Sequence, residues 1–255
     1  MSAESQYVAH DSDIAPVAAL IADPTRAAIL TALLDARPLA AGELAYLAGV
    51  SAATASAHLA RLLGGGMVTV TKQGRHRYYS LAGADIAAVI EALAHISPRA
   101  QVRSLRQSRQ AAALNDARTC YDHLAGRAGV TLFAALLENK IITTKLPNGC
   151  APADQPGHGD VNLQAACEVT SHGSQTLRAF GINVGDLRRS RRRFAAACLD
   201  WTERRPHLNG ALGAAVTARL LDLRWFERAD TPRALRLTDA GREGLAETFG
   251  CIITQ

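Results

Sequence analysis

The 255-residue sequence lacks the short motifs that characterise several large enzyme classes. It has no P-loop, no glycine pattern of a dinucleotide-binding fold, no GxSxG and no HExxH. Its carboxylates are dispersed, and no pair stands out for acid–base chemistry. Cys120 and His123 are three residues apart, which on a helix is poor geometry for activating a nucleophile. We therefore expect a binding protein and not an enzyme.

The five cysteines include no CxxC pair, and their number is odd. This pattern argues against the disulfide framework of a secreted protein. The first residues are polar and acidic, unlike a signal peptide, and no apolar run approaches the roughly 20 residues of a membrane-spanning helix. We expect a cytoplasmic protein with no membrane partner.

Acidic residues are absent from the stretch between Ser51 and Ser80, which contains four Lys or Arg. The whole chain carries a net charge of +5, but residues 1–100 hold seven Lys or Arg against eight Asp or Glu. The positive charge within residues 1–100 is therefore concentrated in one patch and is not spread over the domain. Such a patch indicates an anionic partner.

The elements expected around this patch follow a recognisable order. A helix begins with Asp23 as N-cap, and the next helix ends at Gly49. After a tight turn comes the helix "SAATASAHLARLL", with Ser51 as its N-cap, and three glycines stop it. "MVTVTKQGRHRYYSL" alternates and turns at Gly74, which predicts a β-hairpin, and a closing helix follows. This order predicts a winged helix-turn-helix that binds double-stranded DNA.

A helix that enters the major groove must be slim and must carry short hydrogen-bonding side chains. The expected contacts of this helix are Ser51, Ala53, Thr54, Ser56, His58 and Arg61. The hairpin would lie along phosphates through Lys72, Arg75, His76, Arg77 and Tyr79. Of Tyr78 and Tyr79, one is expected to pack inward and one to contact the DNA backbone. The alternative is an alanine-rich packing helix beside an ordinary surface hairpin.

Residues 14–97 resemble the ArsR/SmtB family of bacterial repressors. The resemblance rests on "DPTRAAILTALL", on "GELAYLAGVSAATASAHLARLLGGGMVTVTKQGRHRYYSL" and on the helix to Ser97. It implies a homodimer paired through the first helix and the helix near 84–96, bound to a two-fold symmetric operator and released by an inducer. "RTCYDHLAGRAGV" and "CLDWTERRPHLNGALGAAV" look like the C-terminal extension of a long-chain subgroup.

The sequence departs from this family where its metal sensors often carry ligands. Such sensors often have a Cys pair in the helix before the recognition helix, which here is "ELAYLAGV". The closing helix has only His95, without the partners of a zinc site. Any sensor is therefore expected in the second domain.

We expect four segments: a disordered tail over 1–12, the DNA-binding domain over 13–98, a basic helical linker over 99–117, and a C-terminal effector and dimerisation domain over 118–255. The fold class is mainly α with small β-hairpins. "ARLL" followed by an apolar pair occurs at 60 and again at 218, and "ALLENKII" starts a weaker third copy. The C-terminal half is thus expected to contain degenerate winged-helix-like units. Acids in the copy at 218 argue against DNA binding there.

Two Cys/His pairs are candidates for the sensor. Cys120 and His123 would share one helical face, and Cys198 precedes His207 by nine residues. If the pairs meet, they form a four-ligand site for a thiophilic metal or metalloid ion. Three other interpretations stay open: plain packing, a redox thiol switch, and a pocket for a small effector lined by Tyr121, Asp122, Trp201, Glu203 and Arg204.

Together these features predict a dimeric DNA-binding transcriptional regulator, a repressor that an effector releases from its operator. One alternative is an adaptor that kept the winged-helix shape for binding proteins. Another is a regulator that responds to thiol oxidation. The five arginines between 188 and 193 either contact flanking DNA or form a solvated helix face.

Overall fold

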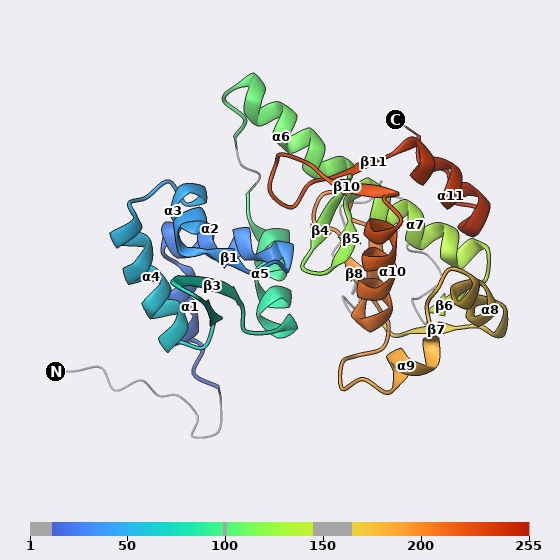
Figure 1. Cartoon of the computed structure of the whole chain (residues 1–255), viewed down its shortest axis with the longest axis horizontal. Helices are drawn as coiled ribbons and strands as arrows, with labels where there is room; N and C mark the ends of the chain where they lie inside the picture. Colours follow the sequence, from blue (N-terminus) through green and yellow to red (C-terminus); the bar gives the residue numbers. More distant parts are fainter. Residues whose placement is uncertain (1–11, 99–100, 145–164, 255) are drawn as a thin grey trace. The chain divides into compact units, whose positions relative to one another are not determined.

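The computed structural model describes residues 12–98, 101–144 and 165–254 (Figure 1). The contacts between residues divide the chain into two compact units, 1–86 and 87–255, which we describe separately. Residues 1–11, which make up almost all of the expected tail, lie outside the described residues, as does Cys150.

The first unit has the element order that the sequence predicts. Its elements are α1 (Ala15–Ile21), α2 (Pro24–Ala32), the 3-10 turn η1 (Leu33–Asp35), β1 (Leu39–Ala40), α3 (Ala41–Leu47), α4 (Ala52–Gly64), β2 (Val68–Gln73), β3 (His76–Leu81) and the start of α5 (Ala84–Ile96). The three strands form one antiparallel sheet in the order β1-β3-β2.

Local chemistry explains where these helices begin and end. The Asp23 carboxylate accepts a hydrogen bond from the backbone N–H of Arg26 at 2.9 Å, and Pro24 occupies the first helical position. Gly49 has φ +67°, the left-handed conformation that a tight exit from α3 requires. The Ser51 hydroxyl then accepts from the N–H of Thr54 at 3.2 Å and starts α4. These predicted caps are confirmed.

The core of the first unit contains the apolar faces of α2 and α4 and part of the turn η1. Ile29, Leu30 and Leu33 are fully buried, together with Leu59 and Leu62 from α4. One face of α4 is therefore anchored by the hydrophobic effect, which leaves the opposite face free to meet a partner.

The second unit contains the rest of α5 and fourteen further elements within the described residues. They are α6 (Leu105–Asp116), β4 (Arg118–Cys120), β5 (His123–Ala125), α7 (Gly126–Glu138), β6 (Ile142–Thr144), β7 (Cys167–Val169), α8 (Ser171–Ala179), α9 (Val184–Arg188), β8 (Ala196–Leu199), β9 (Pro206–Asn209), α10 (Gly210–Asp222), β10 (Phe226–Arg228), β11 (Leu235–Leu237) and α11 (Asp239–Phe249). Helix α6 buries none of its side chains, as expected of a solvated helix. The domain boundary near residue 98 stays a prediction. The division by contacts falls earlier, within α5, whose residues from Ala87 onward belong to the second unit.

The second unit is built from two copies of one motif. Each copy has a β-hairpin, a helix, a strand pair and a second helix: β4-β5-α7-β6-β7-α8 and β8-β9-α10-β10-β11-α11. The second helices begin alike: Thr170 accepts from the N–H of Gly173 at 2.8 Å, and Thr238 from that of Gly241 at 3.0 Å. The helix, strand pair and helix of each copy repeat the order α4-β2-β3-α5, which is the element order of the predicted winged-helix-like units.

The two copies pair their strands reciprocally. Thr119 N–H donates to the Arg233 carbonyl at 2.9 Å, just before β11 of the second copy. In the same way, Ala197 N–H donates to the Ala165 carbonyl at 2.8 Å, just before β7 of the first copy. Helix α7 contacts β9, and α10 contacts β5. The copies thus share one hydrophobic core, with an approximate two-fold relation between them.

The structure corrects the prediction that "RTCYDHLA" is helical. Cys120 and His123 lie directly opposite each other across the antiparallel pair β4-β5, joined by a two-residue turn in which Tyr121 has φ +58°. A spacing of three residues fits both one helical face and the two ends of such a turn. The helix begins only at Gly126.

Among the described residues, no single helix is both long enough and apolar enough to cross a membrane. The pair formed by 15–21 and 24–35 meets the criterion only together, and it is bent by 81°.

Candidate DNA-binding surface and a buried cysteine–histidine cluster

Helix α4 exposes mostly small side chains to solvent. Ala55, Leu59 and Leu62 form its buried face, each with no exposed surface. Most exposed positions carry small or short polar side chains: they are Ser51, Ala52, Ala53, Thr54, Ser56, Ala57, Ala60 and Gly64. The larger exposed side chains, Arg61 and Leu63, lie near the end of the helix. A helix with so little bulk on its outer face fits the dimensions of a major groove.

The hairpin β2-β3 places its basic side chains in solvent. Lys72 pairs in register with Arg77, and Gln73 with His76, around a turn at Gly74 with φ +60°. Lys72, Arg75, His76 and Arg77 are all exposed. None of the four forms an ion pair with a carboxylate within the described part of the chain. Their charge is therefore available to phosphates.

Two predicted DNA contacts need correction. Tyr79 is only 6% exposed, because the pairing of β3 with β1 sets it opposite Leu39 and directs it inward, so it has no surface for DNA. Tyr78 is the half-buried one of the pair. The His58 imidazole lies partly buried, with Nδ1 3.5 Å from the Asp23 carboxylate. This side chain therefore faces the start of α2 and not the exposed side of α4.

The second unit brings all four predicted metal ligands together. One ligand atom from each of Cys120, His123, Cys198 and His207 lies within 4.8 Å of every other. Each hairpin contributes one pair, because Cys120 is opposite His123 and Cys198 is opposite His207 in the strand register. Both imidazoles are buried, Cys120 is buried, and Cys198 is half-buried.

A carboxylate faces one nitrogen of each histidine. His123 Nδ1 is 3.5 Å from Asp122, and His207 Nδ1 is 3.5 Å from Asp200. The two rings stack with centroids 5.0 Å apart and an interplanar angle of 27°. Both aspartates follow a ligand cysteine by two residues, so each hairpin carries Cys-x-Asp before its histidine. Sequence reasoning gave Asp122 a different role, in a small-molecule pocket, and missed Asp200, although the repeated pattern was visible.

The electrostatics of the cluster follow from burial and close partners. A hydrogen bond with Cys198, together with burial, raises the pKa of the Cys120 thiol. Burial opposes ionisation of Asp200, but the charges of Arg118 and His207 and several hydrogen bonds hold its pKa below the usual range. Asp200 accepts from Arg118 at 2.9 Å and from the N–H of Gly126 at 2.7 Å.

Two glycines allow the helices to approach the hairpins closely. A side-chain Cβ at Gly129 would collide with the Leu124 carbonyl and reach His207 Cβ at 3.5 Å. At Gly213 it would collide with the Leu208 carbonyl and reach His123 Cβ at 3.2 Å. "HLAGRAG" and "HLNGALG" therefore repeat the same histidine and glycines for the same reason, a second signal that sequence reasoning missed.

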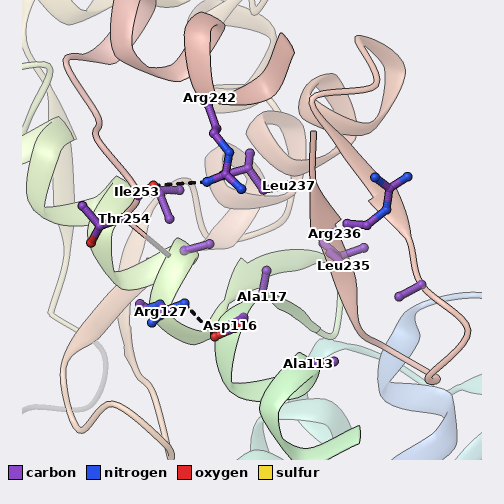
Figure 2. Close-up of a pocket in the computed structure, with 12 residues that line it drawn as sticks. Ala113, Asp116, Ala117, Arg127, Leu235, Arg236, Leu237, Arg242, Ile253 and Thr254 are labelled. Atoms are coloured by element: carbon purple, nitrogen blue, oxygen red, sulfur yellow. Dashed lines mark hydrogen bonds and ion pairs between the residues drawn. The ribbon is translucent and has the colours of Figure 1, made fainter. Parts of the chain in front are cut away.

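The residues predicted to line a small-molecule pocket do not line the cavity in Figure 2. That cavity of about 420 Å³ is lined by α6, α7, the β10–β11 pair and residues near the C-terminus, and includes the Arg127–Asp116 ion pair of 2.8 Å. Trp201 instead packs under the Arg118 guanidinium, 4.7 Å from its ring centroid. Asp122 forms an ion pair with Arg192.

The arginine-rich segment between 188 and 193 is partly neutralised within the chain. Arg188 pairs with Glu168 at 2.7 Å, and Arg189 pairs with Asp186. Arg192 is held by Asp122, so at least three of the segment's five arginines have carboxylate partners within the described residues. This leaves less charge for flanking DNA than the sequence alone suggests.

Comparison with known proteins gives consistent matches. The sequence profile of a family described as a helix-turn-helix domain matches residues 21–71. The chain is 44% identical over 230 residues to the uncharacterized HTH-type transcriptional regulator YdfF of Bacillus subtilis, covering 90% of this chain and 94% of that one. It is 37% identical over 86 residues to the HTH-type transcriptional regulator CmtR of Mycobacterium tuberculosis, covering 34% of this chain and 72% of CmtR.

Two solved structures show similarity to the first part of the chain. One is the cadmium metal-sensor CmtR of Mycobacterium tuberculosis, with 34% identity, a TM-score of 0.30 and coverage of 36% of this chain and 100% of that one. The other is the homodimeric winged helix-turn-helix DNA-binding domain Mb0332 of Mycobacterium bovis, with 32% identity, a TM-score of 0.30 and coverage of 35% and 88%.

Proposed function

Since the chain belongs to the HTH-type transcriptional regulators, we propose that it is a homodimeric repressor of the ArsR type that leaves its operator when an effector binds the second unit. The observation that carries this proposal is the pairing of an exposed, small-residue face on α4 with a wing free of acids. The major-groove contacts would be Ser51, Ala53, Thr54, Ser56 and Arg61. The phosphate contacts would be Lys72, Arg75, His76 and Arg77.

Exposed apolar side chains support the dimer. Ile14 next to α1 is 67% exposed and Val17 within α1 is 43% exposed, although both are apolar. On α5, Val89, Leu93 and Ile96 are exposed as well. Large apolar side chains in solvent on two helices are typical of an interface. These are the two helices through which the family resemblance implies pairing.

Effector control requires the second unit to favour one dimer geometry. We consider two dimer geometries, one that binds DNA and one that does not. An effector with unequal affinity for them changes the free energy of DNA binding by the difference between its two binding free energies, typically about 1–3 kcal/mol. The second unit supports this role because it holds a largely buried group of two cysteines and two histidines that could bind a ligand.

A salt titration tests DNA binding directly. Full-length protein is used to select a duplex from a random-sequence pool, and fluorescence anisotropy then measures its affinity at increasing salt. We expect log K to fall linearly with log salt, with a slope of about −0.9 per phosphate contacted. Four basic side chains per wing and two wings per dimer predict a slope steeper than about −4.

An adaptor that binds proteins would give a different result. It would select no duplex from the pool, and any residual binding would show no sequence preference at physiological salt. That outcome would contradict the proposed function.

A further inference from the structure

The cysteine–histidine cluster contains buried polar atoms with nothing to bond to. Within the described residues, His123 Nε2 and both ring nitrogens of His207 have no hydrogen-bond partner. The histidines are only 3% and 1% exposed, so water does not readily satisfy these atoms. An unsatisfied buried polar group costs free energy and is rare in native proteins. Three such atoms on two histidines, beside two thiols, indicate a missing partner.

The cluster is also a product of the fold's internal symmetry. Each copy of the motif supplies one cysteine, one histidine and one carboxylate, with the same strand register in both hairpins. The glycines at 129 and 213 let each helix approach the histidine of the other copy. Equivalent groups from both copies therefore converge on one point between them.

We propose that this point binds one divalent ion of the zinc group, Zn²⁺ or Cd²⁺, through the sulfurs of Cys120 and Cys198 and the Nε2 atoms of His123 and His207. Two thiolates and two imidazoles form a tetrahedral donor set that suits these ions. Asp122 and Asp200 would accept a hydrogen bond from each Nδ1–H and so orient the rings.

The charge balance suits a buried site. Each thiol loses its proton to solvent as its sulfur forms a bond to the ion, so two protons are released. The two thiolates then cancel the charge of the ion, and the histidines bind as neutral imidazoles. A neutral core avoids the cost of burying an uncompensated charge.

Binding would fix the two hairpins to each other through one ion. The four ligand atoms already lie within 4.8 Å of one another. In a tetrahedral site with metal–sulfur bonds of about 2.3 Å, the sulfurs would lie about 3.8 Å apart. Any adjustment that this geometry requires is a movement of the ligand-bearing hairpins.

Side chains of α5 connect this movement to the rest of the chain. His95 Nε2 lies 2.7 Å from the carbonyl of Leu199, which follows Cys198. Glu91 pairs with Arg233, whose Nε donates at 3.1 Å to the carbonyl of Thr119, which precedes Cys120. Both ligand-bearing hairpins are thus tied to α5. The last step, from α5 to the dimer and the operator, rests on the proposed function, and in that step the metal is the effector.

The test uses full-length protein, stripped of metal by a chelator and kept reduced without added thiols. Zn²⁺, Cd²⁺ and the spectroscopic probe Co²⁺ are titrated separately. We expect one ion per chain, and X-ray absorption of the Zn²⁺ form showing two sulfurs at about 2.3 Å and two nitrogens at about 2.0–2.1 Å. A Cys120→Ser, Cys198→Ser double variant should bind roughly 100-fold more weakly or worse, since loss of outer-shell partners alone costs 10–100-fold.

Matched controls separate loss of ligands from loss of fold. Cys251→Ser changes another buried cysteine outside the cluster and should bind metal as the wild type does. If the double variant does not fold, the site is tested by the X-ray absorption spectrum of the wild type and by the metal affinity of a single His207→Gln variant. A folded wild type that binds no ion overturns the site, as does a Cys120–Cys198 disulfide that forms instead of the metal complex under the same conditions.

The DNA affinity of the protein, measured with and without the ion, distinguishes failure of the metal site from failure of the proposed function. We expect the ion to weaken binding to the selected duplex about 5- to 150-fold. Metal binding with unchanged DNA affinity would overturn the effector role and leave the site intact. Metal binding by a protein that selects no DNA in either state would overturn the proposed function instead.

Discussion

An Arg75→Ala, Arg77→Ala double variant is expected to bind every DNA duplex more weakly than the wild type. Both guanidinium groups are exposed at the tip of the β2-β3 wing, and neither pairs with a carboxylate within the described residues. A hydrogen bond to a charged group contributes about 1.5–3 kcal/mol. Loss of each arginine should therefore weaken binding roughly tenfold or more per protomer.

The salt dependence identifies the cause of this loss. Each phosphate contact removed should reduce the slope of log K against log salt by about 0.9, and the loss should be similar for selected and unrelated sequences. The matched control is Arg178→Ala, Arg236→Ala, which removes the same charge from exposed positions of the second unit. If both double variants lose affinity and slope equally, the effect is one of net charge and the wing has no special role.

An Asp200→Asn variant is expected to destabilise the second unit strongly. The Asp200 carboxylate and Arg118 are almost completely buried, and Asp200 also accepts from the N–H groups of Gly126 and Thr202. The substitution leaves the Arg118 charge buried without its counter-ion and turns an amide NH₂ toward backbone donors. Breaking a buried pair in this way costs about 3–5 kcal/mol. For a unit of this size the melting temperature should fall by about 6–20 °C.

Calorimetry of the metal-free protein measures this effect on folding alone. Asp186→Asn is the control, because Asp186 pairs with Arg189 at the surface, where both side chains are more than half exposed. Exposed pairs contribute about 0–1 kcal/mol, so this variant should melt within a few degrees of the wild type. Equal melting temperatures for Asp200→Asn and wild type would contradict a structural role for the buried pair.

Much of the first unit was predictable because its signals are local. Asp23 and Ser51 cap helices through bonds to residues three positions along, and Gly74 turns a hairpin whose strands are adjacent in sequence. The inward direction of Tyr79 was not predictable, because it depends on pairing with β1, about 40 residues earlier. His58 was misplaced for the same reason, since its partner Asp23 lies 35 residues away.

The buried cluster illustrates the same limit in the second unit. Residue types and spacing were sufficient to select Cys120, His123, Cys198 and His207, but the spacing suggested a helix where the chain forms a hairpin. Their convergence depends on reciprocal pairing between Thr119 and Arg233 and between Ala197 and Ala165. Such long-range pairs leave no local pattern. The duplicated Cys-x-Asp and His-Leu-x-Gly-x-x-Gly sequences were the available signal for the symmetry.

The most direct test of the account is the affinity of an Ala57→Glu variant for the selected duplex. Ala57 is exposed on α4, and glutamate is a good helix former, so the fold should be unaffected. A carboxylate on the face that enters the groove should repel phosphates and reduce affinity roughly 100-fold, whereas Ala57→Gln, of similar size, should lose far less. Unchanged affinity of Ala57→Glu at an unchanged melting temperature would show that α4 does not face DNA.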